Sequence, residues 1–112
     1  MIYKILSTSE WDQARAAEHF IGTAMDHQSG FIHLSGADQV VETARRFFAG
    51  VTGLTLLTVD PGRLGEALRW ESSRGGALFP HLYGVLPVEA VVAAEALPAD
   101  RPAADAVAAL LG

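Results

Sequence analysis

The chain alternates short apolar runs with polar segments, and the spacing within the runs predicts strands and helices in turn. Residues 2–6, 54–59 and 91–97 are apolar, partly β-branched and as short as typical buried strands. The run 54–59 has the strongest strand pattern, so we expect it at the centre of a sheet. Further strands are predicted at 31–34, 68–71 and 77–83, and Pro80 favours an edge or a bulge for the last of these.

Helices are predicted where apolar residues recur every three or four positions. The run Ser7-Thr8-Ser9-Glu10 has the form of a capping box. It opens a helix over about 10–20 that would bury Trp11, Ala14 and Ala17 and end near Gly22. Ser35 or Asp38 would cap a second helix with a buried stripe at Val40, Ala44, Phe47 and Phe48, and residues 102–111 form a third, Ala-rich helix. Residues 23–29 are expected to be irregular.

These elements favour one α+β domain over 1–112. Five or six strands and two or three helices, with hairpin-like neighbours in the second half, indicate a mainly antiparallel sheet that can be split rather than regular parallel units. The 112 residues, half of them hydrophobic, suffice for a single core.

Composition and charge limit the compartment and the kinds of ligand that we expect. The absence of Cys removes disulfides and thiolate chemistry, and the N-terminal run, interrupted by Lys4, fits neither a signal peptide nor a membrane span, so we expect a cytoplasmic protein. The formal charge of −5 argues against sequence-independent binding to nucleic acid. Residues 63–83, however, carry three Arg against two acidic residues, which suits a small anionic ligand.

Five polar side chains stand out because they lie on predicted strands among large apolar neighbours. Strand alternation puts His33 on the face of Phe31, Arg69 on the face of Glu71 and His81 on the face of Tyr83. Strands hold side chains rigidly, as a preorganised site requires. The alternative is a buried hydrogen-bond network without a ligand, in which His33→Ala would lower stability and no ligand would raise the melting temperature.

The sequence fits other kinds of catalytic or binding site less well. The four His lack metal-ligand spacing, no G-x-S-x-G elbow is present, and Arg74-Gly75-Gly76 is not a phosphate-binding loop. Trp70 and Tyr83 flank polar positions and can stack on a base or a nicotinamide ring, although the core is the favoured place for Trp70. The remaining large aromatic residues are expected in the core: Trp11, Phe47, Phe48 and Phe79.

Several segments together resemble the family of small bacterial proteins known as domain of unknown function 952. They are Ile2-Tyr3-Lys4-Ile5, Trp11, Gly30-Phe31-Ile32-His33-Leu34-Ser35, Gln39, Leu56-Leu57-Thr58-Val59-Asp60, Arg69-Trp70-Glu71 and Phe79-Pro80-His81-Leu82-Tyr83-Gly84. That family is similar in fold to the ADP-ribosyltransferase superfamily, particularly its RNA 2′-phosphotransferase branch. Lys4 stands where the phosphotransferases have the first His of their H-G-T strand.

The resemblance implies an ADP-ribosyltransferase-like fold and binding of NAD, ADP-ribose or another phosphate-containing ligand in a His/Glu/Tyr cleft, with transfer or hydrolysis of ADP-ribose as the reaction. His33 and Ser35 match the V-H-L-S strand that contacts NAD. Glu71 would stabilise an oxocarbenium-like ribose, and His81 would move a proton. Tyr83 and Trp70 would stack on rings, and Arg69 or Arg74 would hold the pyrophosphate. The alternative is a non-catalytic pocket for a nucleotide or small anion.

Overall fold

The computed structural model describes the backbone of residues 1–112 and every side chain except that of Arg74. Its helices and strands follow one another along the chain as β1 (Ile2–Ser7), α1 (Thr8–Ala17), β2 (His19–Phe20), α2 (Ala24–Ser29), β3 (Ile32–His33), β4 (Ser35–Gly36), α3 (Val40–Phe47), β5 (Leu54–Val59), β6 (Leu68–Ser72), β7 (Leu78–Leu82), β8 (Leu86–Pro87), β9 (Val91–Ala96) and α4 (Ala103–Leu111). Single 3-10 turns lie at Pro61–Arg63, Gly65–Ala67, Arg74–Gly76 and Val88–Ala90.

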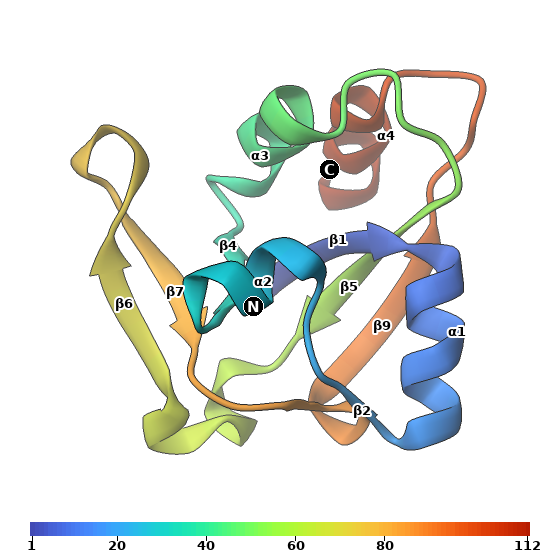
Figure 1. Ribbon diagram of the computed structural model, residues 1–112. Coiled ribbons are helices and arrows are strands. Elements are labelled where there is room, and N and C mark those ends of the chain that lie inside the picture. Colours follow the sequence, from blue (N-terminus) through green and yellow to red (C-terminus); the bar gives the residue numbers. More distant parts are fainter.

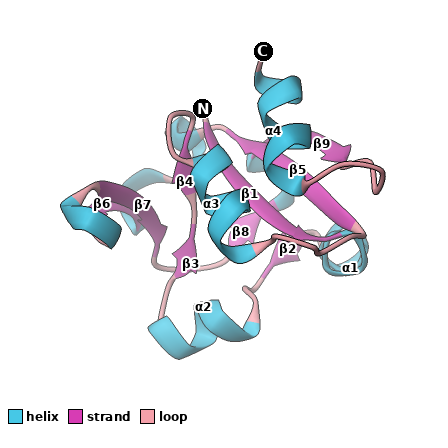
Figure 2. Cartoon of the chain, turned by 90° about the horizontal axis from the view of Figure 1, so that it is seen from above, coloured by secondary structure: helices cyan, strands magenta, loops and turns pink.

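The strands form split antiparallel sheets, as the α+β prediction allows. The main sheet has the order β4-β1-β5-β9, a second has the order β3-β7-β6, and β2 pairs with β8. The apolar strand β5 lies between β1 and β9, so its predicted central place is confirmed. Seen from above, the β6–β7 pair and β9 lie at opposite sides of the molecule, with β1 between them (Figure 2).

Two apolar clusters cover the two faces of the main sheet. On one face Leu6 and Val59 pack with Trp11 of α1 and with Leu82 of the second sheet. On the other face Ile5 and Leu56 pack under α3 and α4, which lie side by side (Figure 1). The second sheet is therefore fixed to the first through a shared core.

The first helix begins as predicted but ends earlier. Ser7 and Glu10 form the capping box, while Glu18 adopts a left-handed conformation, with φ 67°, and ends the helix well before Gly22. The chain then straightens so that Phe20 pairs with Leu86 in β2–β8. The predicted irregular segment 23–29 instead contains α2, because Thr23 and Asp26 form a second capping box.

The run 31–34 is not one continuous strand. Ile32–His33 pairs with β7, and Ser35–Gly36 pairs with β1, so the chain passes from one sheet to the other at Leu34. Ser35 is therefore a strand residue and caps no helix. The helix α3 begins at Val40 after Gln39, without a side-chain cap, which corrects the predicted cap at Ser35 or Asp38.

Four expectations about individual side chains were wrong. Ala17 is exposed rather than buried, and α1 buries only Trp11 and Ala14. Phe47 and Trp70 are each 49% exposed rather than part of the core. Pro80 lies in the middle strand of its sheet rather than at an edge. A proline has no backbone N–H to donate to a neighbouring strand. None is needed at Pro80, because the paired part of β3 ends at His33, which lies opposite His81.

Candidate functional site

Strand pairing in the second sheet brings residues from distant parts of the sequence together. His33 of β3 lies opposite His81 of β7, and His81 lies opposite Arg69 of β6. Glu71 is two residues along from Arg69 and shares its face. The two predicted runs therefore meet on one face of this sheet.

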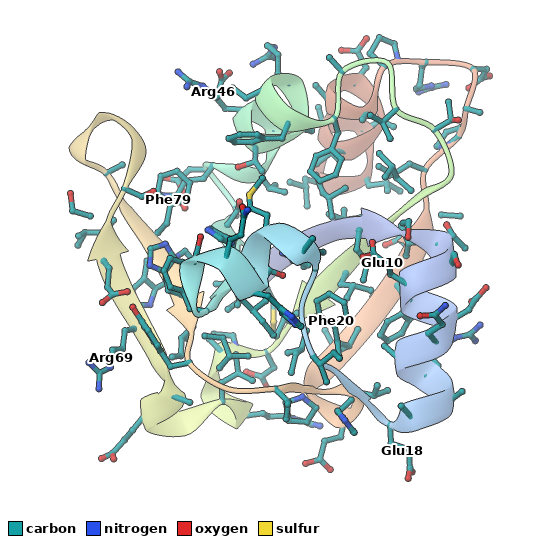
Figure 3. All side chains as sticks on the ribbon, in the orientation of Figure 1. Glu10, Glu18, Phe20, Arg46, Arg69 and Phe79 are labelled. Atoms are coloured by element: carbon teal, nitrogen blue, oxygen red, sulfur yellow. The ribbon has the colours of Figure 1, made fainter. Side chains whose placement is uncertain are left out.

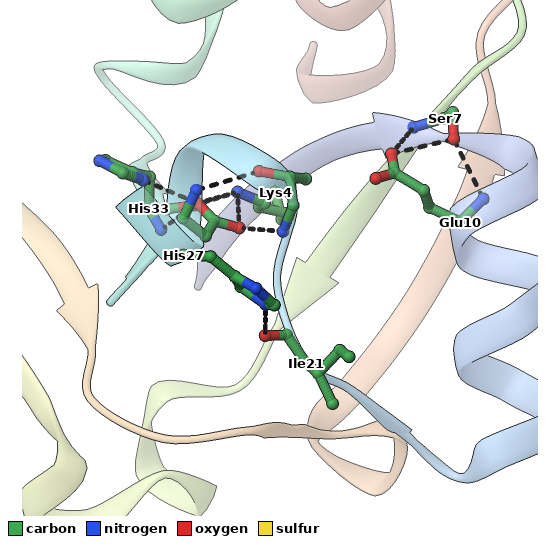
Figure 4. Close-up of polar contacts among 8 residues, drawn as sticks. Lys4, Ser7, Glu10, Ile21, His27 and His33 are labelled. Atoms are coloured by element: carbon green, nitrogen blue, oxygen red, sulfur yellow. Dashed lines mark hydrogen bonds and ion pairs between the residues drawn. The ribbon is translucent and has the colours of Figure 1, made fainter. Parts of the chain in front are cut away.

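The side chain of His33 is held by a buried carboxylate. Asp26 Oδ1 lies 2.7 Å from His33 Nδ1 and accepts the backbone N–H of the same residue at 3.0 Å. Lys4 Nζ lies 3.1 and 3.0 Å from the two oxygens of Asp26 and donates to the carbonyl oxygen of His33 at 2.9 Å. Thr23 N–H donates to Asp26 Oδ2 at 2.9 Å. Figure 4 shows these contacts around Lys4 and His33.

These donors keep the carboxyl group of Asp26 ionised. Burial by itself would raise the pKa of Asp26, which is only 2% exposed. The hydrogen bond from His33, the charge of Lys4 and the backbone N–H groups of Thr23 and His33 outweigh burial, and they hold the pKa of Asp26 well below its usual range.

His81 is held by a second carboxylate. Its Nδ1 lies 2.8 Å from Glu71 Oε1, and the hydroxyl of Tyr83 donates to the same oxygen at 2.6 Å. The hydrogen bonds from Tyr83 and then from His81 lower the pKa of Glu71, and the same contact with Glu71 raises the pKa of Tyr83. His81 is buried, whereas the side chain of Glu71 is 37% exposed.

The ring of Phe31 packs against the rings of both histidines. Its ring is stacked on His81 with centroids 4.0 Å apart, and it lies 4.6 Å from the ring of His33 and 5.3 Å from that of Tyr83. The two imidazole centroids are 5.9 Å apart. Since each Nδ1 is engaged by a carboxylate, Nε2 is the ring nitrogen that each histidine can offer to a ligand.

Both histidines line a cavity of about 540 Å³ between α2, α3, β1 and β7. Its other walls are largely apolar, and they include Met25, Val40, Phe47, Phe48 and Phe79. Figure 3 shows Phe79 on the inner side of β7, toward α3. The cavity thus combines largely apolar walls with two oriented imidazoles.

Five of the eight predicted site residues lie in the cavity wall or are connected to it by hydrogen bonds. His33, Ser35 and His81 line the cavity, and Ser35 Oγ lies 2.9 Å from Thr43 Oγ1. Glu71 and Tyr83 do not line the cavity. Glu71 contacts the lining residue His81, and Tyr83 donates a hydrogen bond to Glu71.

The remaining three predicted site residues lie elsewhere or outside the description. The guanidinium of exposed Arg69 lies 5.4 Å from the ring centre of Tyr83, and Figure 3 shows it pointing outward. Trp70 is on the other face of β6, since it alternates with Arg69 and Glu71. The side chain of Arg74 falls outside the described part.

Lys4 and Asp26 were not predicted as site residues. Alternation along β1 puts Lys4 on the buried face between Ile2 and Leu6, where an ammonium group needs a partner. The pattern Thr23-x-x-Asp26 was a helix-start signal that could have revealed α2. Neither signal, however, says that the two residues meet.

The described part of the chain also bears on two further features, a metal site and a membrane-spanning helix. Its side chains include no group of three or more His, Cys, Asp or Glu arranged to hold a metal ion. No helix in the described chain has the length and apolarity needed to cross a membrane.

Comparison with known proteins gives a family and a structurally characterised relative. In the crystal structure, protein CC0527 from Caulobacter crescentus is 49% identical, with a TM-score of 0.87 over 96% of this chain and 97% of that chain. Its solution NMR structure gives 53% identity and a TM-score of 0.77 over 86% and 83% of the two chains. None of the curated proteins matches. Residues 5–94 match the model described as "Protein of unknown function (DUF952)", and the chain belongs to this family.

Proposed function

We propose that the cavity binds a small nucleotide-derived ligand, with NAD and ADP-ribose as the first candidates. The observation that supports this most is the pair of carboxylate-held histidines, His33 and His81, in the wall of a largely apolar cavity. Its volume of about 540 Å³ is within the range of small-molecule sites. The resemblance to ADP-ribosyltransferases suggests the nucleotide.

The lining residues suit some parts of such a ligand better than others. Phe47, Phe48 and Phe79 provide apolar and aromatic surface for a base or nicotinamide ring. His33 and His81 can hydrogen-bond ribose hydroxyls. A diphosphate finds less support among the described lining residues, because their one ammonium group, Lys4, is already paired with Asp26.

In this proposal the two histidines move protons. NAD, when bound, supplies a nicotinamide leaving group and a ribose carbon that becomes positively charged as that group departs. His33 Nε2 would orient a hydroxyl or remove its proton, and His81 would do the same from the neighbouring strand. Glu71 would act through His81, because its Oε1 already accepts from Tyr83 and contacts His81.

Isothermal calorimetry with NAD, ADP-ribose and nicotinamide tests binding. We expect His33→Asn and His81→Asn to weaken binding at least ten-fold, about 1.4 kcal/mol. His19→Asn is the matched control, since exposed His19 is absent from the cavity wall. Glu71→Gln should weaken binding less than either histidine variant. No binding of any of the three compounds to the wild type removes the proposal.

Binding without turnover is the second candidate function. It is favoured by the position of Glu71, the carboxylate expected to stabilise a reacting ribose, which is not among the residues that line the cavity. Incubation with NAD separates the two candidates. Release of nicotinamide that depends on His33 supports an enzyme, and tight binding without release supports a carrier or sensor.

A further inference from the structure

A buried ion pair lies in the wall of the cavity, in an environment where apolar side chains would be expected. Lys4 is 7% exposed and Asp26 is 2% exposed, and Lys4 occupies a core-facing position of β1 between Ile2 and Leu6. Removing two charges from water is unfavourable, and well-packed apolar residues of similar size often stabilise a fold as well or better. Packing alone therefore gives no reason for this pair.

The contacts of the pair converge on one residue. Asp26 Oδ1 accepts the backbone N–H of His33 and contacts its ring Nδ1, while Lys4 Nζ donates to its backbone carbonyl. All three polar groups of His33 other than Nε2 are thus held by the ion pair. The side chain of His33 is 33% exposed, so it is the member of the network that reaches outward.

Asp26 is itself fixed at its other end. Its Oδ2 accepts the N–H of Thr23, and its own N–H donates to Thr23 Oγ1, which closes the capping box of α2. Lys4 is fixed by the pairing of β1 with β5, where it lies opposite Leu57. The carboxylate that faces His33 is therefore attached to two separate elements, and the imidazole has little freedom to turn.

We infer that Lys4 and Asp26 are positioning residues for His33, which hold its ring in the Nδ1–H form and leave Nε2 as a proton acceptor facing the cavity. An ionised carboxylate 2.7 Å from Nδ1 requires a hydrogen on that nitrogen. Lys4 neutralises the carboxylate and at the same time holds the backbone of His33. The inference deepens the proposed function by naming the acceptor atom, and its test uses no ligand.

The test is ¹⁵N NMR of histidine side chains at a pH where His33 is neutral, since the two ring nitrogens then distinguish the two tautomers. In the wild type we expect the Nδ1–H form of His33 to predominate. In the double variant Lys4→Met/Asp26→Leu, which removes both charges together, we expect the ratio of Nδ1–H to Nε2–H to fall at least five-fold. Exposed His19 in the same sample provides a reference, and Glu42→Gln removes an exposed carboxylate as a control.

A second measurement is the rate of acylation of His33 by diethylpyrocarbonate, read by peptide mass spectrometry relative to His19. We expect the relative rate to change several-fold in the double variant and to stay unchanged in Glu42→Gln. A purely structural role would lower stability without moving the tautomer ratio of the variant that still folds. Either that result or a wild-type His33 in the Nε2–H form overturns the inference. If this double variant does not fold, Lys4→Met/Asp26→Asn, which also removes both charges but keeps hydrogen-bonding atoms, is measured in its place under the same criteria.

These outcomes are separate from those of the proposed function. Failure of NAD, ADP-ribose and nicotinamide to bind leaves the tautomer measurement unaffected. Conversely, a ligand can bind while His33 proves to be in the other tautomer, which would remove the positioning role and keep the binding site.

Discussion

The ion pair of Lys4 and Asp26 gives the sharpest prediction about stability. Both Asp26 oxygens lie within hydrogen-bond distance of Lys4 Nζ, and both side chains are almost completely buried. Replacing Lys4 with Met keeps an unbranched chain of similar length but leaves a buried carboxylate without its cation. Replacing Asp26 with Asn keeps hydrogen-bonding atoms but leaves a buried ammonium without its anion.

The expected effect is large for the single changes and smaller for the double change. Breaking a buried pair by removing one partner destabilises by about 3–5 kcal/mol, because the remaining charge is uncompensated. For a domain of this size that corresponds to a fall in Tm of roughly 12–30 °C. The double variant Lys4→Met/Asp26→Asn buries no charge, so we expect it to lose less stability than either single variant and to show a coupling energy above about 2 kcal/mol.

Urea unfolding followed by circular dichroism at pH 7 measures all four proteins of the cycle. Glu42→Gln is the control, because Glu42 pairs with Arg45 and Arg46 on the surface, and such exposed pairs contribute about 0–1 kcal/mol. If both single variants lose no more than this control, or if their losses simply add, Lys4 and Asp26 do not act as a buried pair and the reasoning is refuted.

Three further predictions follow from local geometry. Because the pKa of Asp26 is lowered on folding, its carboxylate contributes its full stabilisation above the unfolded pKa of about 3.8, and this contribution is lost as the pH falls below 3.8. Urea unfolding at a series of pH values should therefore show the free energy of unfolding falling in acid, and falling less steeply in Lys4→Met/Asp26→Asn. Equal slopes in the two proteins contradict this. Gly22→Ala should destabilise more than Gly50→Ala in thermal melts, because both have positive φ but a Cβ at Gly22 would lie 3.0 Å from Asp26 Cβ, whereas nothing lies within 4 Å at Gly50. Tyr83→Phe should raise the pKa of Glu71 in a carboxyl ¹³C titration, since it removes the main hydrogen bond that lowers it; an unchanged midpoint rejects that contact.

Local patterns in the sequence were sufficient for several elements. The capping box at Ser7 and Glu10, the apolar strand at Leu54–Val59 and the alternation of Ile32 and Leu34 against Phe31 and His33 depend on neighbours within a few residues. Interactions of that range can be recognised without knowing the fold. The same is true of the antiparallel α+β class, which follows from the order and the length of the runs.

Errors arose where a contact from elsewhere in the chain decided the local structure. The end of α1 depends on the pairing of His19–Phe20 with Leu86–Pro87, which lies far along the sequence. The switch of strands at Leu34 depends on two different partner strands, β7 and β1. The position of Pro80 inside its sheet depends on where β3 stops.

The sequence by itself determined which residue types were out of place among apolar neighbours, and it indicated His33 and His81 on that ground. Only the tertiary structure decided their partners. The carboxylate of Asp26 and the ammonium of Lys4 are separated from each other by 22 residues, and a buried charge needs a partner close in space, wherever it lies in the sequence. The pairing of strands and the packing of α2 set such distances. They therefore decide that the two histidines lie together at one cavity, each oriented by a carboxylate.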